Sequence, residues 1–180
     1  EMGIGNSASA ALLMHRLAPA PLDACVGQGA GHSPNGMARK RAVLAQAAAR
    51  SDATAPLEVL TQFGGYEIAM MAGALLAAAR VGVPVLVDGF IGTAAALLAV
   101  RLAPNARDYC LFAHASAEAG HRLMLEALDA RPLLQLGMRL GEGTGALLAV
   151  PLVQAACALL SEVCLLYTSD AADEGLGEDL

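Results

Sequence analysis

Short apolar runs alternate along this chain with longer segments rich in Ala and Leu. We predict strands at residues 22–26, 83–87 and 108–113, and a weaker one at 133–136. We predict helices at residues 7–17, 34–50, 56–62, 65–80, 93–102, 117–130 and 145–163. Because strands that alternate with helices form a sheet with helical cover, the pattern predicts an α/β fold: a doubly wound, mostly parallel sheet with helices on both faces.

Ligands of such sheets bind at the loops that follow the carboxyl ends of the strands. The loops to search are therefore residues 27–33, 88–92, 114–120 and 137–144. Ser33 before Pro34 predicts a helix start, and Thr93 and Thr144 are further candidate helix caps.

The composition excludes some classes of protein. Apolar residues make up 56% of the chain but aromatic residues only 3%, which suits helices packed tightly on a buried sheet. The formal net charge is −6 and we find no basic cluster, so we expect no nucleic-acid partner. The apolar segment 145–160 contains Pro151 and falls short of the roughly 20 residues that span a membrane. We therefore predict a core helix there and no membrane partner.

The cysteines and the start of the chain bear on the compartment. No two cysteines have the paired spacing of a metal or redox motif, so we expect buried thiols of a cytoplasmic protein. The chain opens on Glu1 without a basic leader, and we expect no signal peptide. The cysteines are Cys25, Cys110, Cys157 and Cys164.

The segment GEGTG at residues 141–145 precedes a predicted helix. Its glycines free the backbone and expose N–H groups, and the start of a helix with open N–H groups binds anions such as phosphate. Glu142 is a candidate functional carboxylate because it lies between two of these glycines. The alternative is a helix-capping loop with a surface glutamate.

The segment VGQGAG at residues 26–31 follows a predicted strand, which is the position of a phosphate-binding turn. Its third glycine falls one place early for the dinucleotide-binding fingerprint, which counts against a nucleotide-binding oxidoreductase domain. Lys40, on the next predicted helix, could reach a bound anion. Alternatively, Lys40 and its neighbours Arg39 and Arg41 form a solvated helix face.

Two further loops carry chemically useful side chains. His114, Glu118 and His121 would share one face of a continuous helix and could bind a metal, as in a metal hydrolase. Gly120 argues against such a helix, and we predict no metal site. Asp88 ends a predicted strand, where it is either a site residue or a turn former.

These loops belong to six segments that, in this order, resemble successive motifs of the nicotinate-nucleotide–dimethylbenzimidazole phosphoribosyltransferase family. The segments are EMGIGNSASAALL, CVGQGAG, FGGYEIAMMAG, VLVDGFIGTAAALLA, FAHASAEAGH and MRLGEGTGALLA. The resemblance runs from Glu1 to about Val163. It implies transfer of phosphoribose from nicotinate mononucleotide to 5,6-dimethylbenzimidazole, giving α-ribazole 5′-phosphate and nicotinate in nucleotide-loop assembly of cobalamin.

The resemblance also implies a homodimer, small-molecule substrates, and no metal or tightly bound cofactor. It assigns the catalytic base to Glu142 and places Glu1 in the site near the ribose. Two further loop positions, Asp88 and Gly143, complete our candidate substrate-binding set. The positions that match substrate-binding residues of the family are Gly3, Gly29, Gly31, Lys40, Ser116, Leu140 and Gly141.

The chain departs from the family in its second motif, where Gln28 and Ala30 replace the usual Arg and Thr. His32 begins a stretch, HSPNG, that replaces a more acidic one. The family's N-terminal half, which supplies part of the base pocket, precedes the matched region, so we expect residues 1–180 alone to be inactive. An inactive gene fragment or a non-catalytic nucleotide-binding relative remains the alternative. Retention of Glu142 within GEGTG favours the enzyme.

We assign residues 1–163 to the C-terminal part of the phosphoribosyltransferase domain and residues 164–180 to a non-native tail. Residues 164–174 read CLLYTSDAADE, which resembles the translation of a common sequencing adapter. Residues 170–180 are acidic and contain glycine, with too little apolar surface to offset their ordering entropy.

We expect deletion of residues 164–180 to leave the fold unchanged, because we predict that the non-native tail packs poorly. The measurement is the thermal unfolding midpoint by circular dichroism, with and without the tail. A midpoint lowered by more than about 4 °C, roughly 1 kcal/mol for a domain of this size, would give the tail a structural role.

Overall fold

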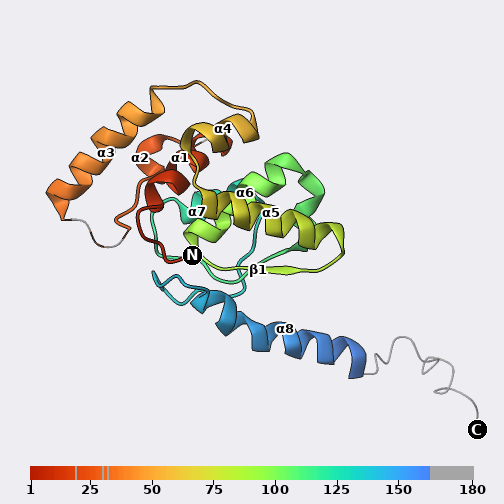
Figure 1. The fold of residues 1–180 in the computed structure, drawn as a ribbon. Helices are drawn as coiled ribbons and strands as arrows, with labels where there is room; N and C mark the ends of the chain where they lie inside the picture. Colours follow the sequence, from red (N-terminus) through yellow and green to blue (C-terminus); the bar gives the residue numbers. More distant parts are fainter. Residues whose placement is uncertain (19, 30, 32, 163–180) are drawn as a thin grey trace, which may run out of the picture. The chain divides into compact units, whose positions relative to one another are not determined.

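The computed structural model describes residues 1–18, 20–29, 31 and 33–162. Ala30, His32 and the predicted tail 164–180 lie outside the described residues. The chain divides into two compact units, Glu1–Ala149 and Val150–Leu180, and the arrangement below is that of the first. The elements in chain order are α1 (Ser7–Leu17), α2 (Leu22–Cys25), α3 (Pro34–Ala48), α4 (Pro56–Phe63), α5 (Tyr66–Arg80), β1 (Val85–Val87), α6 (Phe90–Leu102), the 3₁₀ helix η1 (Pro104–Tyr109), β2 (Cys110–Phe112), α7 (His121–Ala127) and α8 (Thr144–Glu162) (Figure 1).

The sheet consists of β1 and β2, which pair in parallel with Val85 opposite Cys110 and Val87 opposite Phe112. Parallel neighbours need a long crossover connection, and α6 with η1 provides it. The predicted α/β class is thus confirmed. The weaker strand predicted at 133–136 is reduced to an isolated bridge between His114 and Leu134, which extends the pairing beyond the end of β2.

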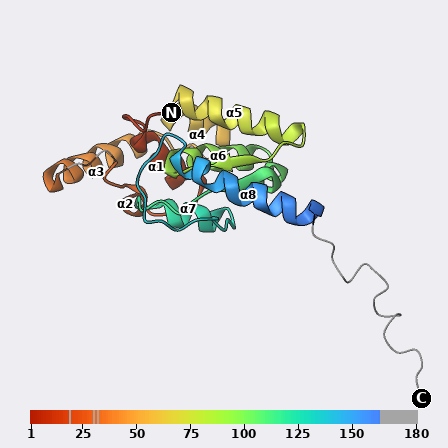
Figure 2. The same cartoon turned by 90° about the horizontal axis from the view of Figure 1, so that it is seen from below.

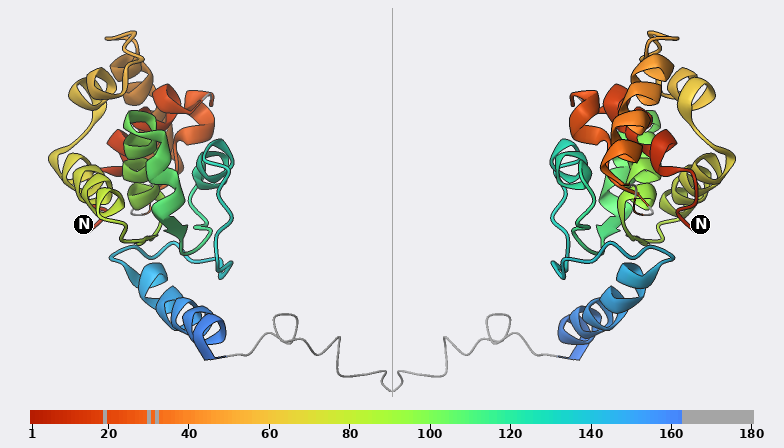
Figure 3. Two further views of the ribbon diagram at one scale, coloured as in Figure 1. Left: turned by 90° about the vertical axis from the view of Figure 1, so that its right-hand side faces the viewer. Right: turned by 90° about the vertical axis from the view of Figure 1, so that its left-hand side faces the viewer.

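Helix α6 is the centre of the first unit. Ten of its thirteen residues are buried, and it packs against α1, α4, α5 and α7. Figures 2 and 3 show α5 and α7 on opposite sides of α6, with α1 also against it. A helix that is apolar on all sides must be covered on all sides, and the run Ala94–Val100 is apolar throughout. The Leu97 and Leu98 side chains are fully buried.

The helix starts agree with the sequence at one predicted cap and differ at two. Ser33 caps α3, since its hydroxyl accepts a hydrogen bond from the Gly36 amide at 3.2 Å, with Pro34 in the first turn. Thr93 is not a cap: α6 begins three residues earlier, and Thr93 is buried within it. Thr144 is the first residue of α8, where Asp88 supplies the capping carboxylate to the Ala146 amide.

Two predicted elements are corrected. Residues 22–26 are not a strand, because Leu22–Cys25 form the short helix α2 directly after Pro21. A short apolar run cannot be assigned to strand or helix by periodicity alone. The helix predicted at 117–130 shrinks to His121–Ala127, because Gly120 has φ +83° and breaks the preceding turn.

The predicted burial of the thiols holds for two cysteines and fails for a third. Cys25 and Cys110 are buried and free, and burial raises the pKa of Cys25 to about 11, which makes it an unreactive thiol. Cys157 on α8 is exposed. Cys164 lies outside the described residues.

Helix α8 begins in the first unit and continues from Val150 in the second, so the core helix expected from its sequence stays a prediction. It has 19 residues and is long and apolar enough to cross a membrane. Its most apolar 18-residue stretch has a mean hydropathy of 1.8, and 11% of that stretch is buried. Length and composition alone are weak evidence for a span, because core helices of soluble proteins pass the same test. Leu159 and Leu160 are 61% and 85% exposed within the described part of the chain. The helix is apolar on every side, so its sequence does not indicate which neighbour covers it.

Because α6 is central, shortening one of its buried side chains should lower the stability of the fold. Leu97→Ala should lower the free energy of unfolding by about 2–5 kcal/mol, because a fully buried leucine leaves a cavity. The measurement is urea unfolding followed by circular dichroism. Leu57→Ala is the control, since Leu57 is 61% exposed and should change the free energy by less than about 0.5 kcal/mol. Equal effects would contradict the central role of α6.

Candidate active site

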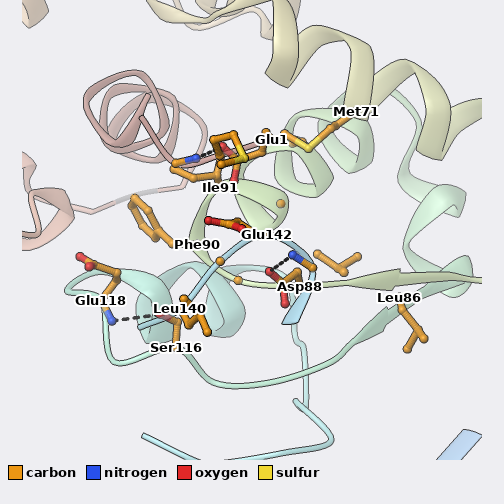
Figure 4. A pocket seen from close by; sticks show the side chains of 18 of the residues that line it. Glu1, Met71, Leu86, Asp88, Phe90, Ile91, Ser116, Glu118, Leu140 and Glu142 are labelled. Atoms are coloured by element: carbon orange, nitrogen blue, oxygen red, sulfur yellow. Dashed lines mark hydrogen bonds between the residues drawn. The ribbon is translucent and has the colours of Figure 1, made fainter. Parts of the chain in front are cut away.

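A cavity of about 700 Å³ lies beyond the carboxyl end of β1. This is the place where ligands bind in sheets of this kind, and the volume suits a small molecule. One part of the wall is polar and the other is apolar, formed by α5, β1 and the start of α6. Figure 4 shows many of the side chains that line it. The polar part contains Glu1, Ser7, Asp88, Ser116, Glu118, Arg139 and Glu142.

Most of the predicted site residues meet in this cavity. Both predicted catalytic residues, Glu1 and Glu142, are in its wall. Two predicted residues, Gly31 and Lys40, are not among the residues that line it. The substrate-binding candidates that do line it are Gly3, Gly29, Asp88, Ser116, Leu140, Gly141 and Gly143.

Glu142 has an unusual backbone conformation for a glutamate. Its φ is +64°, and the following residue, Gly143, has φ +78°. The left-handed region costs a residue with a side chain about 1–2 kcal/mol. The loop is held from the sheet, because the Asp88 carboxylate accepts hydrogen bonds from the amides of Gly143 at 3.1 Å and Ala146 at 3.0 Å. The strained turn therefore presents an exposed carboxylate at a fixed place in the cavity wall.

Glu1 organises the approach to α1. One of its carboxylate oxygens accepts hydrogen bonds from the Gly3 amide and the Asn6 side-chain amide, both at 2.7 Å. Gly3 and Gly5 both have positive φ, which glycine adopts without strain. The N-terminal segment is thereby folded back so that Glu1 and Gly3 line the cavity beside the first turn of α1.

Lys40 fastens the glycine loop to α1 instead of lining the cavity. Its ammonium group donates to the Ser7 hydroxyl and to the Gly27 carbonyl, both at 2.9 Å. Burial lowers the pKa of Lys40, and the nearby Glu118 carboxylate acts in the opposite direction. Gly29 has φ +55°, and a β-carbon there would lie 2.8 Å from the Ser7 hydroxyl. The loop thus needs glycine at 29 to approach Ser7 closely.

Arg139 is a site residue that the sequence reasoning missed. Its guanidinium donates to the Glu118 carboxylate at 2.9 Å, to the Gly29 carbonyl at 3.0 Å and to the Gln28 side chain at 3.3 Å. It therefore joins three loops at the cavity wall. The available signal was its place one residue before Leu140 in the MRLGEGTG segment.

His114 and His121 form a buried pair. Their ring centroids are 6.3 Å apart, and both side chains are almost completely buried. The Nδ1 of His121 accepts from the Ser116 amide at 2.8 Å, so its proton lies on Nε2, which contacts the Thr93 hydroxyl at 2.9 Å. Burial, together with the neighbouring His114, lowers the pKa of His121 to about 4. His121 therefore stays neutral near pH 7 and fixes Ser116, which lines the cavity.

The metal hypothesis finds no support in this geometry. Residues 114–121 do not form the continuous helix that would align the two histidines with Glu118. Glu118 instead pairs with Arg139. Among the described residues, no group of three or more His, Cys, Asp or Glu side chains could hold a metal ion.

Comparison with known proteins then decides the family. A phosphoribosyltransferase family model matches residues 1–169. The chain belongs to this phosphoribosyltransferase family. It is 58% identical over 175 residues to the nicotinate-nucleotide–dimethylbenzimidazole phosphoribosyltransferase of Ralstonia nicotianae, covering 97% of this chain and 49% of that protein. It is 55% identical over 177 residues to the enzyme of the same name from Azotobacter vinelandii, covering 97% of this chain and 50% of that protein.

A solved structure agrees with these relatives. The crystal structure of CobT from Thermus thermophilus matches with a TM-score of 0.83 and 47% identity, covering 87% of this chain and 47% of that one. The resemblance inferred from the six segments is confirmed. The chain spans about half the length of the relatives that it matches.

The buried histidine pair predicts how stability depends on pH. Because the folded-state pKa of His121 is lowered from 6.5 to about 4, the unfolded chain binds more protons between these values. The stabilising contribution of neutral His121 is therefore fully present above pH 6.5 and lost as the pH falls towards 4. The loss is at most roughly 3 kcal/mol.

The measurement is the free energy of unfolding in urea at several pH values between about 7.5 and about 4.5. His121→Gln should flatten the slope in this range. His15→Gln removes an imidazole on α1, outside the pair, and serves as the matched variant. An unchanged slope in His121→Gln would show that His121 titrates normally in the folded protein.

Proposed function

We propose that the protein containing this chain transfers phosphoribose from nicotinate mononucleotide to 5,6-dimethylbenzimidazole. The products are α-ribazole 5′-phosphate and nicotinate, and the step belongs to assembly of the cobalamin nucleotide loop. The observation that carries the proposal is Glu142, held in a left-handed turn at the wall of a cavity whose other part is apolar. The relatives that bear the name of this activity support it.

Glu142 is the general base of this reaction. One ring nitrogen of the benzimidazole attacks C1′ of the ribose while the other still carries a proton. A carboxylate within hydrogen-bonding reach of that N–H withdraws the proton and makes the attacking nitrogen more nucleophilic. The bond from C1′ to nicotinate breaks as the new C–N bond forms, so no covalent intermediate with the protein is needed.

The two parts of the cavity suit the two substrates. Phe90, Ile91 and Met71 give an apolar wall for a flat, uncharged benzimidazole. The phosphate belongs at the glycine-rich end, where Gly3 and Gly29 leave the backbone accessible near the start of α1. Helix starts favour anions, and Lys40 lies directly behind Ser7 at this end.

On the same resemblance, we propose that the complete protein acts as a homodimer in the cytoplasm. A non-catalytic role is disfavoured because a protein that only bound nucleotides would not need the strained Glu142. The experiment on oligomeric state is analytical ultracentrifugation of the protein expressed from its whole coding sequence.

Glu142→Gln in that protein should lower turnover by roughly 10²–10⁴, the usual contribution of a positioned base. Binding of nicotinate mononucleotide should persist, because the substitution keeps the size of the side chain. Turnover is measured by chromatographic detection of α-ribazole phosphate. Glu58→Gln on α4 is the control, since Glu58 is exposed and away from the cavity lining. Turnover of Glu142→Gln within threefold of wild type would remove Glu142 from the mechanism.

A further inference from the structure

Asp88 uses both of its carboxylate oxygens on a distant segment of the chain. Oδ2 accepts from the Gly143 amide and Oδ1 from the Ala146 amide, 55 and 58 residues further along the sequence. The first amides of a helix have no partner within it, and a carboxylate there is favoured by hydrogen bonding and by the helix dipole. Asp88 therefore caps α8 from the end of β1, and Figure 4 shows one of these bonds.

The two bonds lie immediately after the strained residue. Glu142 and Gly143 both have positive φ. The amides that bind Asp88 belong to Gly143, the next residue, and to Ala146, four residues after Glu142. A left-handed glutamate persists only where its surroundings hold it. Of the described side chains, Asp88 is the one whose hydrogen bonds reach the backbone on this side of Glu142.

The buried His114 ring packs against the Asp88 carboxylate. Its Nε2 lies 3.6 Å from Oδ1 of Asp88, and its side chain is fully buried. A β-carbon added to Gly145 would overlap the His114 ring and come within 2.8 Å of the Asp88 carboxylate. A β-carbon at Gly89 would lie 3.3 Å from the same Nε2. Because Gly145 and Gly89 have no side chains, the start of α8 and the end of β1 can both pack against the His114 ring.

We infer that Asp88 is a positioning residue for Glu142: it holds the loop that carries the base at the end of β1, and it does not bind substrate. This inference rests on the proposed function, and it revises the expectation that Asp88 contacts the substrate. Because both oxygens are already engaged, a substrate would have to compete with the start of α8 for them. To hold the loop, Asp88 needs only its carboxylate, the amides of Gly143 and Ala146, and the buried His114 ring against which it packs.

The first test uses Asp88→Asn in the protein expressed from its whole coding sequence. The amide nitrogen places a donor against a backbone donor, so one bond to the loop is lost. We expect kcat to fall about 10- to 100-fold, less than for loss of the base itself, while KM for nicotinate mononucleotide changes less than about threefold. Asp108→Asn, at an exposed position of η1, should retain wild-type kcat. A large rise in KM with unchanged kcat would make Asp88 a substrate ligand and overturn the inference.

A double variant separates positioning of the base from an independent contribution. If Asp88 acts through Glu142, then Asp88→Asn in the Glu142→Gln background should lower kcat no further. Two effects that multiply would show independent roles and would contradict the inference.

The second test does not depend on activity. Asp88→Asn should speed hydrogen exchange at the Gly143 and Ala146 amides at least about tenfold, while the amides of α6 keep their protection. Unchanged exchange at both amides would overturn the inference that Asp88 holds this loop, even if kcat fell. If wild-type protein proves inactive as a transferase, the proposed function fails. The exchange measurement still decides whether Asp88 holds the loop.

Gly145→Ala covers the case in which Asp88→Asn does not fold. Its methyl group would push the start of α8 off His114 while leaving Asp88 intact, so exchange at the same two amides should again rise. Gly73→Ala is the matched control, because a β-carbon there meets nothing within 4 Å. Equal exchange in both glycine variants would contradict the inference.

Discussion

The burial of α6 is the constraint on which the rest of the first unit depends. Its run of alanine, leucine and valine side chains has no polar face, so every side must be covered by another element. Small alanine side chains let α1 and α5 approach closely, and α6 makes its most extensive packing with these two helices. The helix begins three residues after β1 ends, so its burial also fixes the end of the strand. That end carries Asp88 and is the edge of the cavity.

The site inherits this rigidity through a few polar contacts between distant segments. Asp88 joins the sheet to the GEGTG loop, Arg139 joins that loop to the glycine loop and to Glu118, and Lys40 joins the glycine loop to α1. Each of these three side chains makes at least one hydrogen bond to a backbone group, so each fixes where a loop lies. The side chains left exposed in the cavity wall, Glu142 above all, are then presented by loops that are tied on both sides. The reaction that we propose depends on the placement of one carboxylate, and this arrangement would supply it.

The sequence predicted most helices of the fold because their ends carry local signals. Ser33 before Pro34 is such a signal, and the segment around α5 has clear length and composition. The sequence failed where the deciding partner is far along the chain. Thr93 lies inside α6, where its hydroxyl contacts His121, 28 residues further along the chain. The all-round apolar pattern of α8 does not indicate which neighbour covers it. A second reason applies to Leu22–Cys25, which is too short for periodicity to separate strand from helix and forms the helix α2.

The candidate site shows the same division. The glycine loops and the lone glutamate between glycines could be found from residue types, because those types have few other uses in a loop. The partnership of Asp88 with Gly143 and Ala146 could not, because it joins residues more than fifty positions apart and involves backbone amides, which the sequence does not display. Arg139 was missed for a similar reason, since a lone arginine beside a glycine-rich loop is common on solvated surfaces.

Two non-glycine residues of the described chain have positive φ, and the contrast between them bears on function. Asp129, with φ +47°, ends the turn after α7, and its carbonyl accepts a hydrogen bond from Arg107 at 2.7 Å. Aspartate is among the residues that tolerate this region best, so structure alone accounts for it. Glutamate has no such tolerance, and at 142 it lies between glycines that would fit the turn without strain. A glycine at 142 would relieve the backbone and lose only the carboxylate, so the retained strain is best explained by what the carboxylate does.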